Sequence, residues 1–358
     1  MSLTLKQRVG LELQRQLRKN NEQLHPLRSL FWECTLRCNM HCRHCGSDCK
    51  MQPEVKDIPA ADFLRAIDSL TPHINPNETF IIVTGGEALL RDDLEEVGLE
   101  LYRRGYPWGV VTNGYLLDKE RLQSLMESGL HSITVSLDGL EEQHNWLRQN
   151  ESSFARATEA IGLLAAQHEV LWDVVTCVNP RNIDRLAELR DLLISLGASS
   201  WRLFSIFPMG RAAGDPNLQL ADKQLRQLMD FIEDERLKVK GERLEVSYAC
   251  EGFLGRYEQR VRDHFFYCRS GIEVASIRCD GAISGCTSVR SHMDQGNIYT
   301  DDLWDVWQNR FKVMRDRSWA RKGHCADCKM WRYCEGSGLH LYDDNGDLLT
   351  CHYHRLKD

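Results

Sequence analysis

The chain lacks any long apolar run. None of its 358 residues belongs to an uninterrupted apolar stretch that approaches the roughly 20 residues of a membrane-spanning helix. Its beginning also lacks the basic, apolar and small-residue order of a secretory signal. We therefore expect a cytoplasmic protein without a membrane span.

An excess of positive charge is absent as well. The chain has 45 Lys and Arg residues against 52 Asp and Glu residues, which gives a net charge of -7. Proteins that bind nucleic acid usually carry a basic surface, so no nucleic-acid partner is predicted. The length allows one large domain and a smaller one.

Internal repeats and low-complexity tracts are also missing, and from about residue 29 short β-rich runs alternate with helical patterns. This alternation predicts an α/β fold with parallel strands in a barrel-like sheet. Six units are too few for a closed eight-stranded barrel, so a partial (β/α)6 barrel is expected, with its chemistry at the C-terminal ends of the strands. The expected strands are Ser29–Thr35, Thr79–Thr84, Trp108–Thr112, Ser132–Leu137, Leu171–Val178 and Trp201–Phe207.

Three segments are expected. Residues 1–28 carry leucines among basic residues, which predicts an amphipathic helix that packs on the main domain; a membrane-surface helix is the alternative. Residues 29–239 form the barrel. Alternation fades in residues 240–358, where cysteines, glycines and aromatics predict a separate cysteine-rich domain.

The fourteen cysteines fall into two groups. Five lie between Cys34 and Cys49 and eight between Cys250 and Cys351, which leaves Cys177 as an expected core residue. In a reducing compartment such grouping favours metal ligation or redox chemistry over disulfides.

The first group contains Cys38, Cys42 and Cys45 with the spacing C-x3-C-x2-C, directly after the first expected strand. Three thiolates in one loop can hold three irons of a 4Fe-4S cluster and leave the fourth iron open. A zinc loop completed by Cys34 or Cys49 is the alternative.

This spacing resembles that of the radical S-adenosylmethionine (SAM) superfamily. The resemblance implies that SAM chelates the open iron and is cleaved reductively to a 5′-deoxyadenosyl radical, which takes a hydrogen atom from a substrate. It also implies a reductase partner such as flavodoxin or ferredoxin.

Further motifs of this family follow the later strands in the same order. Thr84-Gly85-Gly86-Glu87 resembles the GGE motif that binds the SAM amino group, although Ala88 replaces the usual proline. The resemblance implies a SAM site made of Gly85, Gly86, Glu87, Asn113, Ser136, Asp138, Arg148 and Asn179. An Asn-Gly turn explains Asn113 equally well, and a surface ion pair is the alternative for Arg148. A P-x-G-R-A turn, also common in this family, occupies residues 208–212.

The C-terminal cysteines resemble the SPASM extension of this family, which usually holds two auxiliary iron–sulfur clusters. Cys325, Cys328, Cys334 and Cys351 match its far cluster, and Cys268 and Cys286 match the first pair of its near cluster. Taken alone, the four far cysteines would also suit a zinc ribbon.

The near cluster departs from the pattern. The cysteine expected after Cys334 and three intervening residues is replaced by Gly338. Cys250 and Cys279 are available as substitutes; an open iron, a smaller cluster or no cluster are the alternatives. Cys34 and Cys49 are left as buried thiols, redox groups or additional ligands.

The resemblance implies a peptide or protein side chain as substrate. Sulfatase maturases of this branch carry an aspartate where this chain has Thr287, so crosslinking or epimerisation is favoured over sulfatase maturation. Tetrapyrrole or haem maturation is the first alternative, and a non-catalytic iron–sulfur scaffold or electron carrier is the second.

Overall fold

The computed structural model describes residues 3–238, 244–249, 251–289 and 293–357. The expected boundary between residues 239 and 240 lies outside the described residues, as does Cys250.

A single curved sheet organises the chain, and its strand order is β10-β9-β8-β1-β2-β3-β4-β5-β6-β7. Strands β1 to β7 run parallel in chain order, which confirms the expected barrel-like arrangement. A seventh parallel strand, β7, follows the six that the sequence predicted; it is only four residues long. The strands are β1 Ser29–Glu33, β2 Phe80–Thr84, β3 Trp108–Thr112, β4 Leu130–Ser136, β5 Leu171–Val178, β6 Ser200–Ser205, β7 Glu245–Tyr248, β8 Val274–Ile277, β9 Ala282–Ser284 and β10 Gly296–Asn297.

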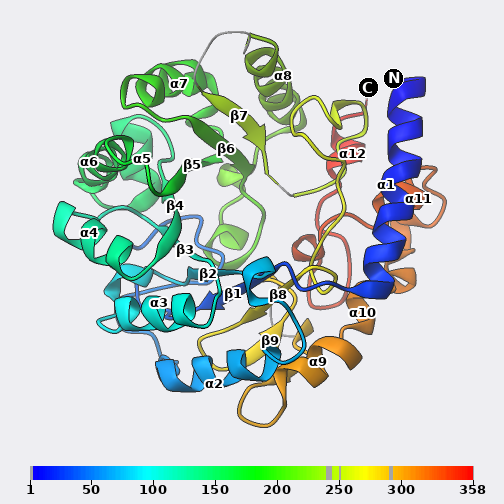
Figure 1. The fold of residues 1–358 in the computed structure, drawn as a ribbon. Helices are drawn as coiled ribbons and strands as arrows, with labels where there is room; N and C mark the ends of the chain where they lie inside the picture. The colour runs from blue at the N-terminus through cyan, green and yellow to red at the C-terminus, as the bar shows by residue number, and fades with distance from the viewer. Residues whose placement is uncertain (1–2, 239–243, 250, 290–292, 358) are drawn as a thin grey trace.

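Helices cover the convex face of the sheet (Figure 1). Along the chain, each helix lies between two consecutive parallel strands, because a parallel pair needs a crossover connection. They are α2 Ala60–Leu70, α3 Leu94–Arg103, α4 Lys119–Glu127, α5 Glu141–Arg148, α6 Ser153–Ala165, α7 Leu186–Ser195 and α8 Asp222–Lys238.

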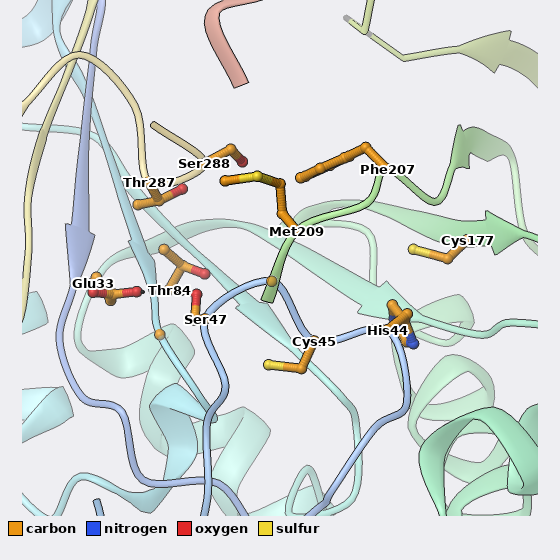
Figure 2. Close-up of a pocket in the computed structure, with 12 residues that line it drawn as sticks. Glu33, His44, Cys45, Ser47, Thr84, Cys177, Phe207, Met209, Thr287 and Ser288 are labelled. Carbon is orange, nitrogen blue, oxygen red and sulfur yellow. Dashed lines mark hydrogen bonds between the residues drawn. The ribbon is translucent and has the colours of Figure 1, made fainter. Parts of the chain in front are cut away.

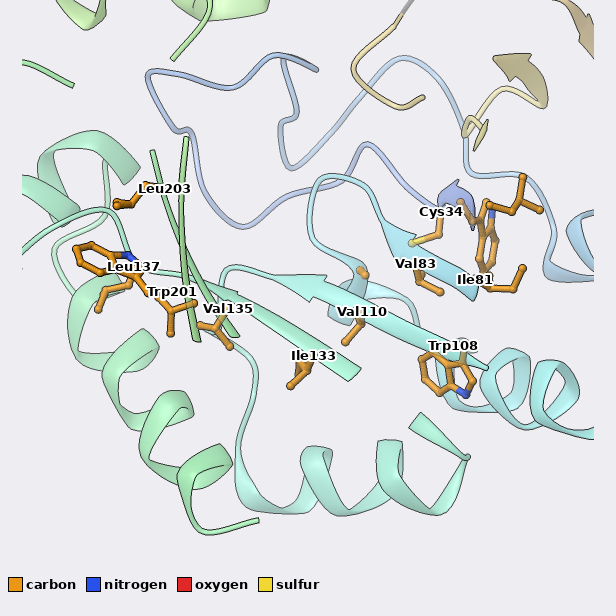
Figure 3. Close-up of a cluster of buried hydrophobic side chains, with 14 of the residues drawn as sticks. Cys34, Ile81, Val83, Trp108, Val110, Ile133, Val135, Leu137, Trp201 and Leu203 are labelled. Atoms are coloured by element: carbon orange, nitrogen blue, oxygen red, sulfur yellow. The ribbon is translucent and has the colours of Figure 1, made fainter. Parts of the chain in front are cut away.

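The core lies between these helices and the sheet. Figure 3 shows alternate residues of neighbouring strands in this layer, for example Ile81 and Val83 of β2 and Ile133 and Val135 of β4, all fully buried. Cys34 belongs to the same core, and burial raises the pKa of its thiol well above its ordinary value. It is therefore a packing residue in this structure.

The N-terminal helix α1, Leu5–Leu24, does not pack on the barrel as expected. It lies beside α11, Trp331–Cys334, in the cysteine-rich region (Figure 1). Its contacts are with the C-terminal region: Gln7 donates to the carbonyl of Arg256, Tyr333 donates to Glu12, and Leu11 is buried against Phe253, Phe265 and Phe266. Its other side leaves aliphatic side chains exposed, at Leu5, Val9, Leu13, Leu17 and Leu24.

The C-terminal region continues the sheet through β8, which pairs parallel to β1, and through the antiparallel strands β9 and β10. Its remaining helices are short: α9 Leu303–Asn309, α10 Lys312–Arg315, α11 and α12 His352–Arg355. Among the described residues, no helix is both long and apolar enough to cross a membrane.

Candidate functional site

A cavity of about 200 Å³ opens at the C-terminal ends of the parallel strands. Most of the sequence-predicted residues meet in its wall, although they come from four separate strand ends and from the end of helix α5. They are Cys38, Cys42, Cys45, Gly85, Gly86, Asn113, Ser136 and Arg148.

Two glycines let the turn after β2 contact the cysteine loop. A Cβ at Gly86 would lie 2.2 Å from the carbonyl oxygen of Arg37, and one at Gly85 would lie 2.4 Å from that of Thr35. The N–H of Gly86 donates to the Thr35 carbonyl at 2.7 Å, and the N–H of Glu87 donates to the Arg37 carbonyl at 2.8 Å. Only a residue without a Cβ allows this approach.

Glu87 lies directly behind the cavity wall. Its carboxylate accepts hydrogen bonds from the Thr112 hydroxyl at 2.7 Å and from the backbone N–H groups of Asn113 at 2.8 Å and Leu89 at 3.1 Å. Burial raises the pKa of Glu87, while these donors counteract the rise. The carboxylate thus joins the ends of β2 and β3 at the cavity.

Asp138 and Arg148 form a buried ion pair with 2.6 Å between Oδ2 and Nε. Burial would raise the pKa of Asp138, but the Arg148 charge lowers it below its ordinary value. Nη1 of Arg148 also lies 3.8 Å from the Cys42 sulfur. Arg148 is therefore a buried residue of the cavity wall, and the surface ion pair considered from the sequence is wrong.

Asn179 contributes to its own turn after β5. Its side-chain oxygen accepts from the Arg181 N–H at 2.9 Å, and its amide donates to the Cys177 carbonyl at 3.3 Å. It is not among the residues that line the cavity.

Arg211, which was not assigned to the site from the sequence, holds the cysteine loop. It donates from Nε to the Cys42 carbonyl at 2.8 Å and from Nη1 to the Cys49 carbonyl at 2.9 Å, and its own N–H donates to the Cys45 carbonyl at 3.0 Å. The P-x-G-R-A turn was the signal for this contact. Its guanidinium brings a second positive charge, after Arg148, to the three thiols.

Cys49 supports Cys45 within the same loop. The thiol of Cys49 donates to the Cys45 sulfur, which lowers the pKa of Cys45 to about 5. The backbone N–H of Cys49 lies 3.4 Å from that sulfur. The structure therefore places Cys49 next to a predicted ligand, in a hydrogen-bonding role.

The sequence predicted Cys177 as a core residue, but the structure also places it at the cavity. It lines the cavity, and its sulfur, a ring nitrogen of His44 and a carboxylate oxygen of Asp138 all lie within 4.8 Å of one another. Burial raises the pKa of Cys177 well above its ordinary value, so the thiol keeps its proton.

A second cavity of about 260 Å³ adjoins the first (Figure 2). The two share His44, Cys45, Thr84, Gly85 and Cys177. The other side chains that line it belong to Glu33, Ser47, Phe207, Met209, Thr287 and Ser288. Since Thr287 and Ser288 directly follow Cys286, this second cavity lies between the first cysteine group and the C-terminal one.

The far cysteines of the C-terminal region share one small cavity. Cys325, Cys328, Cys334 and Cys351 all line it. Burial raises the pKa of Cys325 to about 11, with further contributions from Cys351 and Cys328. Four thiols around one apolar space suit an iron–sulfur cluster.

The near pair, Cys268 and Cys286, is brought together because Gly285 packs against Ser270 and Gly271. Burial would raise the pKa of Cys268, but the positive charge of Arg317 and nearby backbone N–H groups lower it. Cys279 lies in the turn between β8 and β9, at the opposite end of that hairpin from Cys286.

The residues present fit the groups that the sequence implied. Three thiols lie beside the cations Arg148 and Arg211, as a negatively charged cluster requires. The buried Nδ1 of His44 and Nδ2 of Asn39 have no hydrogen-bond partner among the described residues. His44 lines both cavities, so its Nδ1 is available to a ligand there.

Comparison with known proteins agrees with this geometry. The model of the radical SAM superfamily matches residues 32–193, and that of the SPASM iron–sulfur cluster-binding domain matches residues 268–329. An AdoMet-dependent heme synthase of Nitratidesulfovibrio vulgaris is 24% identical over 339 residues, which cover 90% of each chain. The mycofactocin maturase MftC of Mycolicibacterium smegmatis is 27% identical over 316 residues, covering 86% of this chain and 76% of MftC.

The solved structure of native anSMEcpe with bound AdoMet has the same fold, with a TM-score of 0.70 and 19% identity over 92% of this chain and 94% of that one. The expected α/β partial barrel with a cysteine-rich extension is thereby confirmed. A radical SAM domain implies a 4Fe-4S cluster and SAM, and an SPASM domain implies auxiliary iron–sulfur clusters. The chain belongs to the radical SAM superfamily, in the branch with a C-terminal SPASM domain.

Proposed function

We propose that this radical SAM enzyme removes a hydrogen atom from a side chain of a peptide or protein, with the side chain bound in the second cavity. Cys38, Cys42 and Cys45 would hold the 4Fe-4S cluster. Gly85, Gly86, Glu87, Asn113, Ser136, Asp138, Arg148 and Asn179 would form or support the SAM site. When bound, the cluster and SAM supply one-electron chemistry that can break an unactivated C–H bond.

The proposed class of substrate follows from the charge of the second cavity. Its described lining residues include one carboxylate, Glu33, and no Lys or Arg. A tetrapyrrole presents acidic side chains, which proteins usually bind with cationic groups. A neutral or cationic amino-acid side chain needs no such partner.

The size of the cavity points the same way. Its volume of about 260 Å³ is smaller than the roughly 300–1,000 Å³ of pockets that enclose a whole small-molecule ligand. One inserted side chain fits this space, while the rest of a peptide stays outside.

The lining residues divide the tasks of binding and orientation. Phe207 and Met209 supply apolar contact, and the Thr287 and Ser288 hydroxyls supply hydrogen bonds (Figure 2). The protonated thiol of Cys177 lies where the two cavities meet. The SPASM segment after Cys286 thus forms part of the substrate wall.

Tetrapyrrole chemistry is the second candidate. It is favoured by the heme synthase relative, whose whole length the chain nearly spans. The electron carrier or scaffold, by contrast, predicts that SAM is not cleaved.

A direct comparison of substrates tests the proposal. The reconstituted protein would be incubated without oxygen with SAM, dithionite and either a library of short synthetic peptides or Fe-coproporphyrin III. We expect peptides to increase 5′-deoxyadenosine formation and to lose mass by oxidation, and we expect no saturable change in porphyrin absorbance. One-to-one porphyrin binding that stimulates SAM cleavage would overturn the peptide assignment.

A further inference from the structure

Buried polar atoms without partners gather where the near auxiliary cluster has lost its usual cysteine. Within the described residues these are His340 Nε2, Ser337 Oγ, His352 Nδ1 and Glu251 Oε1. An unpaired buried polar atom is costly, so a group of them indicates a missing bonding partner. Arg317 contacts both Ser337 and the Cys268 sulfur and so links this group to the near cysteine pair, which makes a metal cluster the fitting partner.

The imidazole of His340 fills the space of the missing cysteine. A Cβ built on Gly338 would lie 2.6 Å from Cε1 and 2.9 Å from Nδ1 of the His340 ring, and 2.7 Å from the carbonyl oxygen of Glu251. A cysteine at position 338 therefore cannot coexist with this ring position. The chain thus lacks a thiol at position 338 and has an imidazole next to that position.

The same segment contacts the near cysteine pair. The backbone N–H of Leu339 faces the Cys268 sulfur, and Arg317 lies against that sulfur while donating to the Ser337 carbonyl at 2.9 Å. His340 directly follows Leu339 in the short 3-10 turn Leu339–Leu341. The turn thus brings the segment that carries His340 to the Cys268 sulfur.

Cys279 is a poorer substitute. It is buried in the hairpin turn, and β9, a three-residue strand, separates it from Cys286. Such a strand spans roughly 10 Å. Gly285, which adjoins Cys286, lies at the other end of this strand and packs against Ser270.

We propose that His340 is a ligand of the near auxiliary cluster, together with Cys268 and Cys286. Nε2 donates its lone pair to an iron, and the coordination transfers no proton or electron. Nitrogen ligation raises the reduction potential of an iron–sulfur cluster relative to all-thiolate ligation. A cluster of this kind is better suited to accept an electron.

The position of the ring gives this ligand a use. The rings of His340 and Phe207 lie with centroids 4.9 Å apart, and Phe207 lines the second cavity (Figure 2). The ring of Phe207 would therefore separate the cluster from the substrate. At this separation the cluster could accept an electron from the substrate. This inference rests on the SPASM domain and does not depend on the class of substrate.

Pulsed electron paramagnetic resonance tests the ligand directly. The full chain would carry ¹⁵N-histidine and the changes Cys38→Ala, Cys42→Ala and Cys45→Ala, so that reduced auxiliary clusters alone give the signal without SAM. We expect a coupling to a directly bound histidine nitrogen. It should disappear in Gly338→Cys/His340→Ala, which restores the cysteine and removes the imidazole, while iron content is retained. It should persist in His352→Ala.

The opposite results would overturn the assignment. These are a parent protein without histidine nitrogen coupling, or a coupling that survives in Gly338→Cys/His340→Ala. Loss of the coupling in His352→Ala with persistence in His340→Ala would also exclude His340 as the ligand. None of these readouts involves the substrate, so failure here leaves the proposed function untouched.

Discussion

Replacing Arg148 by Met is expected to lower the free energy of unfolding by about 3–5 kcal/mol, because it leaves the buried carboxylate of Asp138 without its counter-charge. Asp138 is fully buried. In the variant its carboxylate would still accept the hydrogen bond from the backbone N–H of Cys177, at 2.8 Å. The same change removes the cation beside Cys42, so SAM binding should be lost as well.

Urea unfolding followed by tryptophan fluorescence would measure this effect. The matched control is Arg65→Met, because Arg65 is 63% exposed and pairs with Asp62 at 2.8 Å; its cost should stay below about 1 kcal/mol. The pKa of Asp138 is lowered, so the contribution of the pair is present above the ordinary carboxyl pKa of about 3.9 and is lost as pH falls below it. Equal stabilities of the two variants at neutral pH would contradict a supporting role for this ion pair.

Replacing Glu87 by Gln is expected to weaken SAM binding by about 10- to 100-fold. The change keeps the shape of the side chain but removes the charge that would accept the SAM ammonium group. A hydrogen bond to a charged group contributes about 1.5–3 kcal/mol, which corresponds to that range of affinity. Calorimetric titration of the reconstituted protein would give the dissociation constant.

Glu33→Gln is the matched control for Glu87→Gln. Glu33 is also an acidic residue at a strand end, but it lines the second cavity and not the first. Its SAM affinity should stay within about twofold of that of the wild type, on the scale where a tenfold change is 1.4 kcal/mol. If Glu87→Gln bound SAM as tightly as Glu33→Gln, the ammonium partner would be a different group.

The sequence predicted the part of the site that local motifs encode. Because parallel strands end at one edge of a sheet, residues placed at or just after the ends of successive strands meet there, and Cys38, Gly86, Asn113 and Ser136 do line one cavity. Arg148 joins them from the last turn of α5. Regular alternation of strand and helix was enough to predict the barrel, although the short β7 escaped it.

What the sequence could not predict depends on contacts between distant segments. Arg211 reaches Cys42 across more than a hundred and fifty residues, and α1 packs on the C-terminal region through Gln7 and Leu11 while its other leucines stay exposed. The ring of His340 lies where a Cβ at Gly338, two positions earlier in the chain, would meet it. Spacing alone reveals the missing cysteine at position 338 but not the imidazole next to that position.

The Cys38, Cys42 and Cys45 loop is expected to support reductive cleavage of SAM. The most direct measurement is the amount of 5′-deoxyadenosine formed from SAM and dithionite by anaerobically reconstituted wild type and by the variant in which these three cysteines are Ala. We predict cleavage by the wild type, none by the variant, and retention of auxiliary iron in the variant. A wild type that holds iron but leaves SAM intact would contradict the account and favour an iron–sulfur scaffold.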